Sequence, residues 1–195
     1  MRVGEVVRRT AETDIQVIWR LDGTGSGSIE TGIGFFDHML TAFGRHGFFD
    51  LTVRAQGDLH VDAHHTVEDV GIVMGQALAK ALGNKAGITR FGTAFVPMDE
   101  ALVMAAVDIS GRPYLALDWE LTYEELGVFP TVLAEEFFRA LAFNSGITLH
   151  VRELAGANMH HLLEAAFKAV ARALDQASRP DSRIEGVLST KGQLG

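Results

Sequence analysis

A short histidine-rich motif occurs twice in this chain. His-His-Thr-Val-Glu at residues 64–68 returns as His-His-Leu-Leu-Glu at residues 160–164 of a chain of 195 residues. Each copy follows a glycine-containing turn and precedes an alanine-rich amphipathic run. Because imidazole nitrogens and carboxylate oxygens are metal ligands, we interpret the repeat as a metal site built by the two halves of a duplicated fold.

The spacing within the motif predicts two metals rather than one. If each motif opens a helix, adjacent residues differ by about 100° around its axis, so His64 and His65 cannot easily bind the same ion. Glu68 lies on the same face as either histidine, at spacings of four and three residues. The same reasoning applies to the second copy, with His160, His161 and Glu164. Each metal would take histidines from both repeats, within one subunit or between neighbouring subunits.

Three of the four histidines outside the motifs divide into two groups. His38 follows Asp37 near a predicted helix start and joins the candidate ligands, whereas His60 and His150 alternate with apolar neighbours and are predicted to be strand residues. Imidazole and carboxylate ligands without thiolate suit Mn, Fe, Co, Ni or Zn.

Four cations are candidates for binding an anion, although each of them alone is most simply a solvated surface charge. Lys191 lies in Ser-Thr-Lys-Gly, where hydroxyls, backbone amides and an ammonium can surround a phosphate. Lys168 lies four residues after Glu164, a spacing that equally fits a helix ion pair. The other two candidates, Arg90 and Arg112, each follow or occupy a glycine turn.

The periodicity of apolar residues predicts the elements that position these groups. In the first half we expect strands near 3–8, 15–21 and 51–55, helices at 35–43 and 64–82, and a Gly/Ser turn at 22–28. In the second half we expect strands near 91–96, 102–109, 114–121 and 147–154, helices at 132–143 and 160–177, and an irregular tail from 179. The sequence thus predicts an α/β (α+β) sandwich of two duplicated strand-strand-helix-strand-helix halves, with helices packed on sheets. The halves are residues 1–85 and 86–195, packed as a single domain.

Composition limits the classes of function. The chain has no cysteine, which excludes disulfides, thiolate metal sites and a cysteine nucleophile and fits a reducing cytoplasm. A net charge of −8 argues against nonspecific binding to nucleic acid. The first residues lack an apolar signal core and no apolar run reaches membrane-spanning length, so we expect no membrane association.

Three classes of function fit these residues. The histidine-rich sites with open positions favour a lyase that binds a nitrogen heterocycle. A dinuclear metallohydrolase would use its metals to activate water, usually with a bridging carboxylate. The third class is a noncatalytic metal-binding or structural shell protein. In such a protein, Glu12 and the cations would not be expected to converge on the metals.

Longer blocks of sequence resemble one family over essentially the whole chain: imidazoleglycerol-phosphate dehydratase, of histidine biosynthesis. The most specific are Asp-His-Met-Leu at 37–40, His-His-Thr-Val-Glu-Asp at 64–69 and the second histidine motif at 160–164. Further matching blocks are 9–13, 32–36, 57–63, 88–92, 98–101, 110–115, 156–159 and 189–192.

The resemblance implies a set of ligands and partners. It implies two Mn(II) ions per active site, a site shared between subunits, and a closed homo-oligomeric shell of roughly two dozen subunits. By position, the implied metal ligands are His38, His64, His65, Glu68, His160, His161 and Glu164. Some relatives have a further histidine ligand where this chain has Glu136, a carboxylate that can also bind Mn(II). The resemblance also implies substrate contacts at Glu12 and His46. The positions implied to hold the substrate mainly by its phosphate are Arg90, Arg112, Lys168, Ser189 and Lys191.

The implied reaction converts D-erythro-imidazole glycerol phosphate to imidazole acetol phosphate and water. No carbonyl stands next to the C–H beside the ring, so the imidazole itself must take up electrons. Metals on both ring nitrogens favour the imidazolate, which can expel the neighbouring hydroxyl and leave a diazafulvene-like intermediate. We assign the proton transfers to Glu12, with Glu164 as a second catalytic carboxylate.

Overall fold

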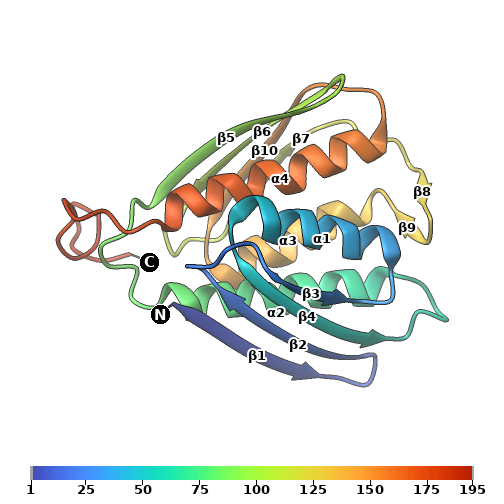
Figure 1. Cartoon of the computed structure of the whole chain (residues 1–195), viewed down its shortest axis with the longest axis horizontal. Coiled ribbons are helices and arrows are strands. Elements are labelled where there is room, and N and C mark those ends of the chain that lie inside the picture. The colour runs from blue at the N-terminus through green and yellow to red at the C-terminus, as the bar shows by residue number, and fades with distance from the viewer. Residues whose placement is uncertain (1, 195) are drawn as a thin grey trace.

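Two four-stranded sheets enclose a layer of helices in the computed structural model, which describes residues 2–194. Figure 1 shows the sheets on the outside, with the four helices between them. The first half contains β1 (Val3–Arg9), β2 (Thr13–Arg20), β3 (Gly27–Glu30), α1 (Gly34–Gly47), β4 (Asp50–Gly57) and α2 (His64–Leu82). The second contains β5 (Phe91–Met98), β6 (Ala101–Asp108), β7 (Tyr114–Asp118), the short β8 (Glu125–Leu126) and β9 (Phe129–Pro130), α3 (Leu133–Ser145), β10 (Thr148–Ala155) and α4 (Met159–Ser178).

The two sheets have the same topology. Their strand orders are β1-β2-β4-β3 and β5-β6-β10-β7, and in each the last pair is parallel while the others are antiparallel. A helix connects the strands of each parallel pair, α1 in the first half and α3 in the second. This correspondence confirms the predicted internal duplication of the fold.

Alternation of apolar and polar residues directs one face of each sheet toward the helices. In β2, Ile15, Val17 and Trp19 are fully buried, while the residues between them are partly or fully exposed. This is the two-residue period of a strand that has only one face in the core. The helices also pack across the halves, α2 against α3 and α1 against α4.

Paired glycines let each sheet approach its helix closely. A Cβ on Gly4 in β1 would lie 1.9 Å from the carbonyl oxygen of Ala77 in α2. A Cβ on Gly92 in β5 would lie 2.0 Å from the carbonyl oxygen of Ala173 in α4. A side chain at either position therefore requires the sheet to move away from the helix.

The predicted elements are confirmed in type, with three strands missed. The expected helix at 64–82 matches α2, and the other predicted helices and strands match to within a few residues. The predicted Gly/Ser turn at 22–28 extends too far, because β3 already begins at Gly27 and pairs with β4. The strands β8 and β9 were also missed, since two residues are too few to show a period. His150 lies in β10 as predicted, but His60 lies in a turn rather than a strand.

Within the described residues, no helix has the length and apolar character needed to cross a membrane.

Candidate metal and substrate site

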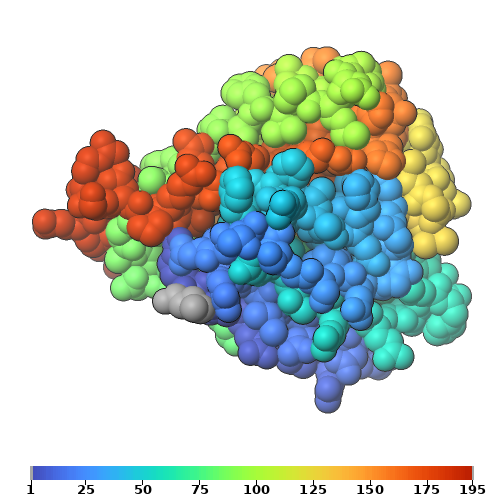
Figure 2. All heavy atoms as spheres, in the orientation of Figure 1, coloured from blue at the N-terminus to red at the C-terminus, as the bar shows by residue number. Residues whose placement is uncertain are grey.

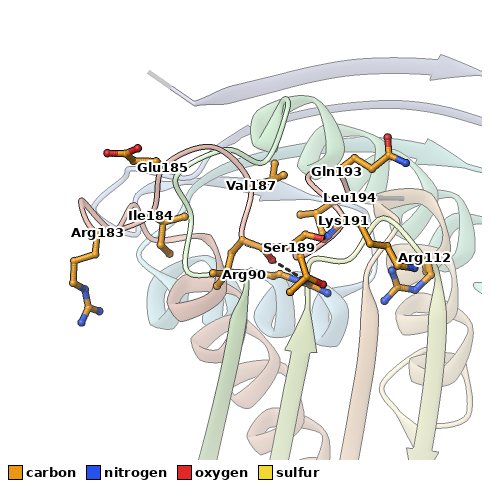
Figure 3. Close-up of a pocket in the computed structure, with 12 residues that line it drawn as sticks. Arg90, Arg112, Arg183, Ile184, Glu185, Val187, Ser189, Lys191, Gln193 and Leu194 are labelled. Atoms are coloured by element: carbon orange, nitrogen blue, oxygen red, sulfur yellow. Dashed lines mark hydrogen bonds between the residues drawn. The ribbon is translucent and has the colours of Figure 1, made fainter.

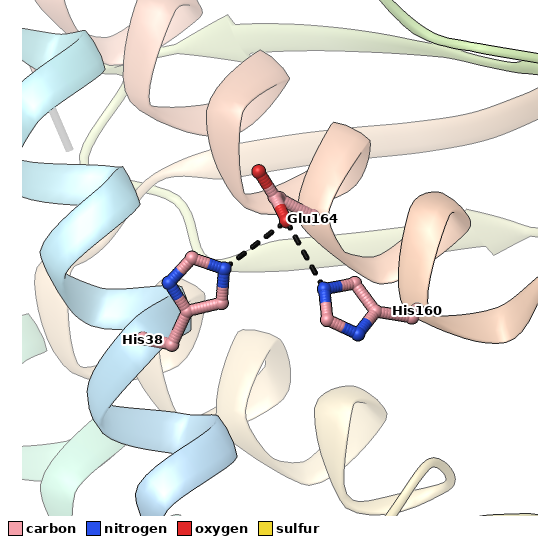
Figure 4. Close-up of side chains that lie close together, drawn as sticks. All are labelled: His38, His160 and Glu164. Carbon is pink, nitrogen blue, oxygen red and sulfur yellow. Dashed lines mark hydrogen bonds and ion pairs between the residues drawn. The ribbon is translucent and has the colours of Figure 1, made fainter.

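Three metal-ligating side chains from two helices converge on one point. His38 of α1 and His160 of α4 each place Nε2 3.2 Å from the same oxygen, Oε2 of Glu164. One ligand atom from each residue lies within 4.8 Å of the others, an arrangement that one ion could bridge. Figure 4 shows the two rings directed at the carboxylate. The four-residue spacing of His160 and Glu164 on α4 brings them onto one face, as the sequence predicts.

Lys168 occupies the other oxygen of the same carboxylate. Its Nζ lies 2.5 Å from Oε1 of Glu164, one turn further along α4. Burial alone would raise the pKa of Glu164, but hydrogen bonds from Lys168 and His38, with the positive charge of Lys168, lower it. The carboxylate is therefore held ionised, with Oε2 directed at the histidines.

The first histidine motif forms a weaker version of this arrangement. His64 Nε2 lies 3.8 Å from Oε2 of Glu68, again at a four-residue spacing. Glu136 of α3 is the counterpart of His38, because each lies ten residues before a left-handed helix cap, Gly146 and Phe48 respectively. Within residues 2–194, however, the only ion pair of Glu136 is with Arg139, at 4.0 Å.

The second histidine of each motif is held by a carboxylate from elsewhere in the chain. His65 Nδ1 lies 3.0 Å from Asp58, and His161 Nδ1 lies 2.8 Å from Glu100. These hydrogen bonds raise the pKa of both histidines. The hydrogen bond between His161 and Glu100 also lowers the pKa of Glu100 to about 2. When Nδ1–H donates to a carboxylate, Nε2 keeps its lone pair for a metal.

Glu12 lies beside the first motif on a hairpin that is anchored to α2. Its carboxylate is 3.9 Å from Nε2 of His65. In the same turn, Thr13 donates a hydrogen bond of 2.5 Å to the buried Asp69 of α2, and Arg8 pairs with the same oxygen at 2.5 Å. These two contacts fix the turn that carries Glu12.

A cationic cavity lies at the other end of the molecule. It has a volume of about 820 Å³ and brings together four of the predicted substrate contacts (Figure 3): Arg90, Arg112, Ser189 and Lys191. Arg183 also lines it, and the C-terminal tail that forms one wall projects from the body of the protein in Figure 2. A cavity with this excess of cations suits a phosphate.

The other predicted substrate contacts lie elsewhere. Lys168 is paired with Glu164, and His46 occupies the last turn of α1. Burial, followed by the nearby positive charge of Lys168, lowers the pKa of His46. Of the contacts predicted as one set, Glu12 lies beside His65. The fold of a single chain places His46 and Lys168 near Glu164 and the remaining four contacts at the cavity.

These two places are far apart within one chain. The helices α2 and α4 both begin at the end opposite the C-terminal tail, as Figure 1 shows. Arg90 is fixed at the far end of α4, where its N–H donates to the Ala177 carbonyl at 2.8 Å. Thirteen residues separate Glu164 from Ala177, which corresponds to about 20 Å along the helix.

Sequence reasoning missed the carboxylates that orient the site. Asp58 lies in a turn seven residues before His65, whereas Glu100 lies 61 residues before His161. Asp108 contacts Arg90 with both of its oxygens. All three fall in or beside the polar turns that follow predicted strands. Asp58 and Glu100 also fall within blocks that resemble the family, at 57–63 and 98–101.

Comparisons with known proteins identify the family of this chain. The family model described as imidazoleglycerol-phosphate dehydratase matches residues 31–174. Proteins of that name from Acetivibrio thermocellus and Caldanaerobacter subterraneus subsp. tengcongensis are 64% and 61% identical, over 97% and 100% of both chains. The crystal structure from Staphylococcus aureus has a TM-score of 0.83 at 41% identity, covering 92% of this chain and 99% of that one. The structure from Pyrococcus furiosus, in complex with (S)-C348, has a TM-score of 0.84 at 42% identity, covering 97% and 100%. The chain belongs to the imidazoleglycerol-phosphate dehydratase family.

Proposed function

We propose that this chain is a hydro-lyase of histidine biosynthesis that converts imidazole glycerol phosphate to imidazole acetol phosphate and water. The observation that carries the proposal is the convergence of His38, His160 and Glu164 in a member of this family. The cationic cavity at residues 90, 112, 189 and 191 supplies the second requirement, a place for the phosphate.

We propose two Mn(II) ions per active site, held by His38 and the histidines of both motifs with Glu68, Glu136 and Glu164. The donor set fits this metal, because imidazole and carboxylate ligands suit Mn(II), although they do not select it by affinity alone. Bound to the imidazole nitrogens of the substrate, Mn(II) would act as a Lewis acid that draws electron density from the substrate's ring. The carboxylates that hold Nδ1 of His65 and His161 support their assignment as ligands through Nε2.

The reaction removes a hydroxyl from the carbon beside the ring and a proton from the next carbon, and the resulting enol becomes a ketone. We assign the proton transfer to Glu12, which lies on an anchored turn next to a candidate ligand. Glu164 was predicted to be a second catalytic carboxylate. Both of its oxygens are engaged by Lys168 and the histidines, which favours the ligand role for this residue.

We also propose that the active site is completed by another copy of the chain. Five bonds of about 1.5 Å join the imidazole ring to phosphorus, so the phosphorus lies at most about 8 Å from the ring. The metal ligands and the phosphate cavity of one chain are separated by more than twice that length. A cavity contributed by a neighbouring copy removes the discrepancy.

Exposed apolar side chains on one sheet support such contacts between copies. Phe91, Phe95, Tyr114 and Leu154 are 46–62% exposed on or beside the β5-β6-β10-β7 sheet. Apolar surface of this kind is typical of contacts between subunits. A closed shell of roughly two dozen subunits is our proposal for the assembly, and the cysteine-free chain fits a cytoplasmic location.

The experiment that tests the function is an assay of metal-stripped protein with imidazole glycerol phosphate, with and without added Mn(II). We expect imidazole acetol phosphate only when Mn(II) is present. Metal content and circular dichroism would be measured on the same samples. Absence of product from folded protein that carries two metals per chain would contradict the proposal.

A further inference from the structure

The cavity arginines are held in place by one carboxylate that no sequence motif singled out. Asp108 is the last residue of β6, and its side chain is 19% exposed. Its Oδ1 accepts a hydrogen bond from Arg90 Nε at 2.7 Å, and its Oδ2 accepts one from Arg90 Nη2 at 3.0 Å. Arg112 Nη2 lies 3.8 Å from the same Oδ2. Asp108 therefore bridges two of the three arginines that line the cavity, Arg90 and Arg112.

Arg90 is also fixed by its backbone and by its neighbour. It has a φ of 69°, in the left-handed region that few residues other than glycine adopt. Its N–H donates to Ala177 and its carbonyl accepts from Ile109 at 3.0 Å. The guanidinium lies 4.6 Å from the centre of the Phe91 ring, a cation–π contact.

The same guanidinium fastens the C-terminal tail. Arg90 Nη1 donates a hydrogen bond of 2.7 Å to the carbonyl of Leu188, the residue before Ser189. The dashed line in Figure 3 marks this bond. Asp108 thus acts on the tail indirectly, because it binds Arg90 and Arg90 binds Leu188.

We infer that Asp108 is a positioning residue, which sets the spacing of Arg90 and Arg112 for a phosphate and, through Arg90, keeps Ser189 and Lys191 at the cavity. The inference rests on the proposed function for its choice of substrate. Charge alone predicts the opposite, since an aspartate near the cavity repels a phosphate. The direction of the change in affinity when the charge is removed therefore separates positioning from simple electrostatics.

The first test is the variant Asp108→Asn, which keeps the shape of the side chain. We expect the KM for imidazole glycerol phosphate to rise about tenfold, equivalent to about 1.4 kcal/mol, with kcat within about twofold of the wild type. The inhibition constant for inorganic phosphate should rise in parallel, and the metal content should stay unchanged. An unchanged or lower KM would overturn the inference.

The matched control is Asp118→Asn. Asp118 lies in the same sheet and pairs with Arg152 at 2.9 Å, but its side chain is 72% exposed and does not line the cavity. We expect its kinetics to equal those of the wild type. Arg90→Lys keeps the positive charge but loses the two-point contact, so it should reproduce the rise in KM even if Asp108→Asn fails to fold.

A second readout needs no turnover. Trypsin can cut the tail after Arg183 and Lys191, and cleavage follows the population of the released tail. We expect faster cleavage of Asp108→Asn than of the wild type or Asp118→Asn, as followed by mass spectrometry. Equal rates would contradict the role of Asp108 in holding the tail. If cleavage differs while the wild type fails to turn over the substrate, the proposed function fails and the positioning role stands.

Discussion

Each histidine of the two motifs has a carboxylate within 4 Å, and these pairs decide where its nitrogens point. His64 and His160 face a glutamate one turn along their own helix, at 3.8 and 3.2 Å. His65 and His161 face Asp58 and Glu100 at 3.0 and 2.8 Å. Pairing within a helix follows from sequence spacing. Pairing across turns depends on the tertiary fold, which explains why sequence analysis found the histidines but missed Asp58 and Glu100.

The assignment of Glu12 to proton transfer is tested by Glu12→Gln. We expect kcat to fall at least about 100-fold, because the amide keeps the shape but cannot carry the proton. Two metals per chain should remain bound, as measured by elemental analysis. Asp14→Asn is the matched control, since Asp14 lies on the same hairpin and pairs with Arg9 at 2.9 Å. Turnover near the wild-type rate in Glu12→Gln would contradict the assignment.

The pair of Glu100 and His161 predicts how the stability of the metal-free protein depends on pH. The hydrogen bond between them raises the pKa of His161 above its ordinary value of 6.5. The contribution of His161 to the free energy of unfolding is therefore full below pH 6.5 and is lost as the pH rises through the raised pKa. The hydrogen bond from His161, followed by that from Asn158, lowers the pKa of Glu100 to about 2. Its contribution is therefore present above 4.5 and lost as the pH falls toward 2. The pair therefore stabilises the folded protein most between pH 4.5 and pH 6.5.

Urea unfolding of metal-free Glu100→Gln checks this pH dependence. We expect its midpoint to fall below that of the wild type by more at about pH 5.5 than at about pH 9. His161→Asn should show the same pattern, because it removes the other partner. A difference in midpoint that is independent of pH would count against this account of the pair.

At the scale of elements, helices and longer strands could be predicted because burial imposes their periods. The strand β2 shows this with its one buried face, and the helix α2 shows it because it is buried against both α3 and the first sheet. The strand β3 escaped prediction because its four residues include Gly27 and only one large apolar side chain, Ile29. It exists because it pairs with β4, and a Cβ on Gly27 would lie 1.9 Å from the carbonyl oxygen of Leu51.

The close approach of sheet and helix predicts the effect of Gly92→Ala. The added methyl group would meet the carbonyl of Ala173, so we expect the free energy of unfolding to fall by about 1–3 kcal/mol. The control is Gly34→Ala at the start of α1, where a Cβ meets nothing within 4 Å. Urea unfolding should show no loss of stability for the control. Equal stability of Gly92→Ala and the wild type would mean that the sheet moves away from α4 without cost.

At the scale of the whole molecule, the fold separates two groups of residues that the sequence presents as one set. The two histidine motifs, which hold most of the candidate metal ligands, lie at the beginning of α2 and α4. The cavity of Arg90 and Arg112 lies at the end of α4. Sequence analysis identified residues of both groups but could not give the distance between them, because that distance is a property of the assembled helices and sheets. The division of the chain at residues 85 and 86 stays a prediction, although the two sheets have matching strand orders.

The proposal that two copies complete one active site is tested most directly by mixing inactive variants. Glu164→Gln removes a candidate metal ligand at one end of the molecule, and Arg90→Ala removes a candidate phosphate contact at the other. Co-expressed with different affinity tags and purified through both, the two variants should form mixed particles in which some sites are intact. We predict that these particles convert imidazole glycerol phosphate to imidazole acetol phosphate with Mn(II), while either variant alone, or a mixture of Glu164→Gln with His160→Asn, does not. Mixed particles as inactive as the single variants would contradict a site shared between copies.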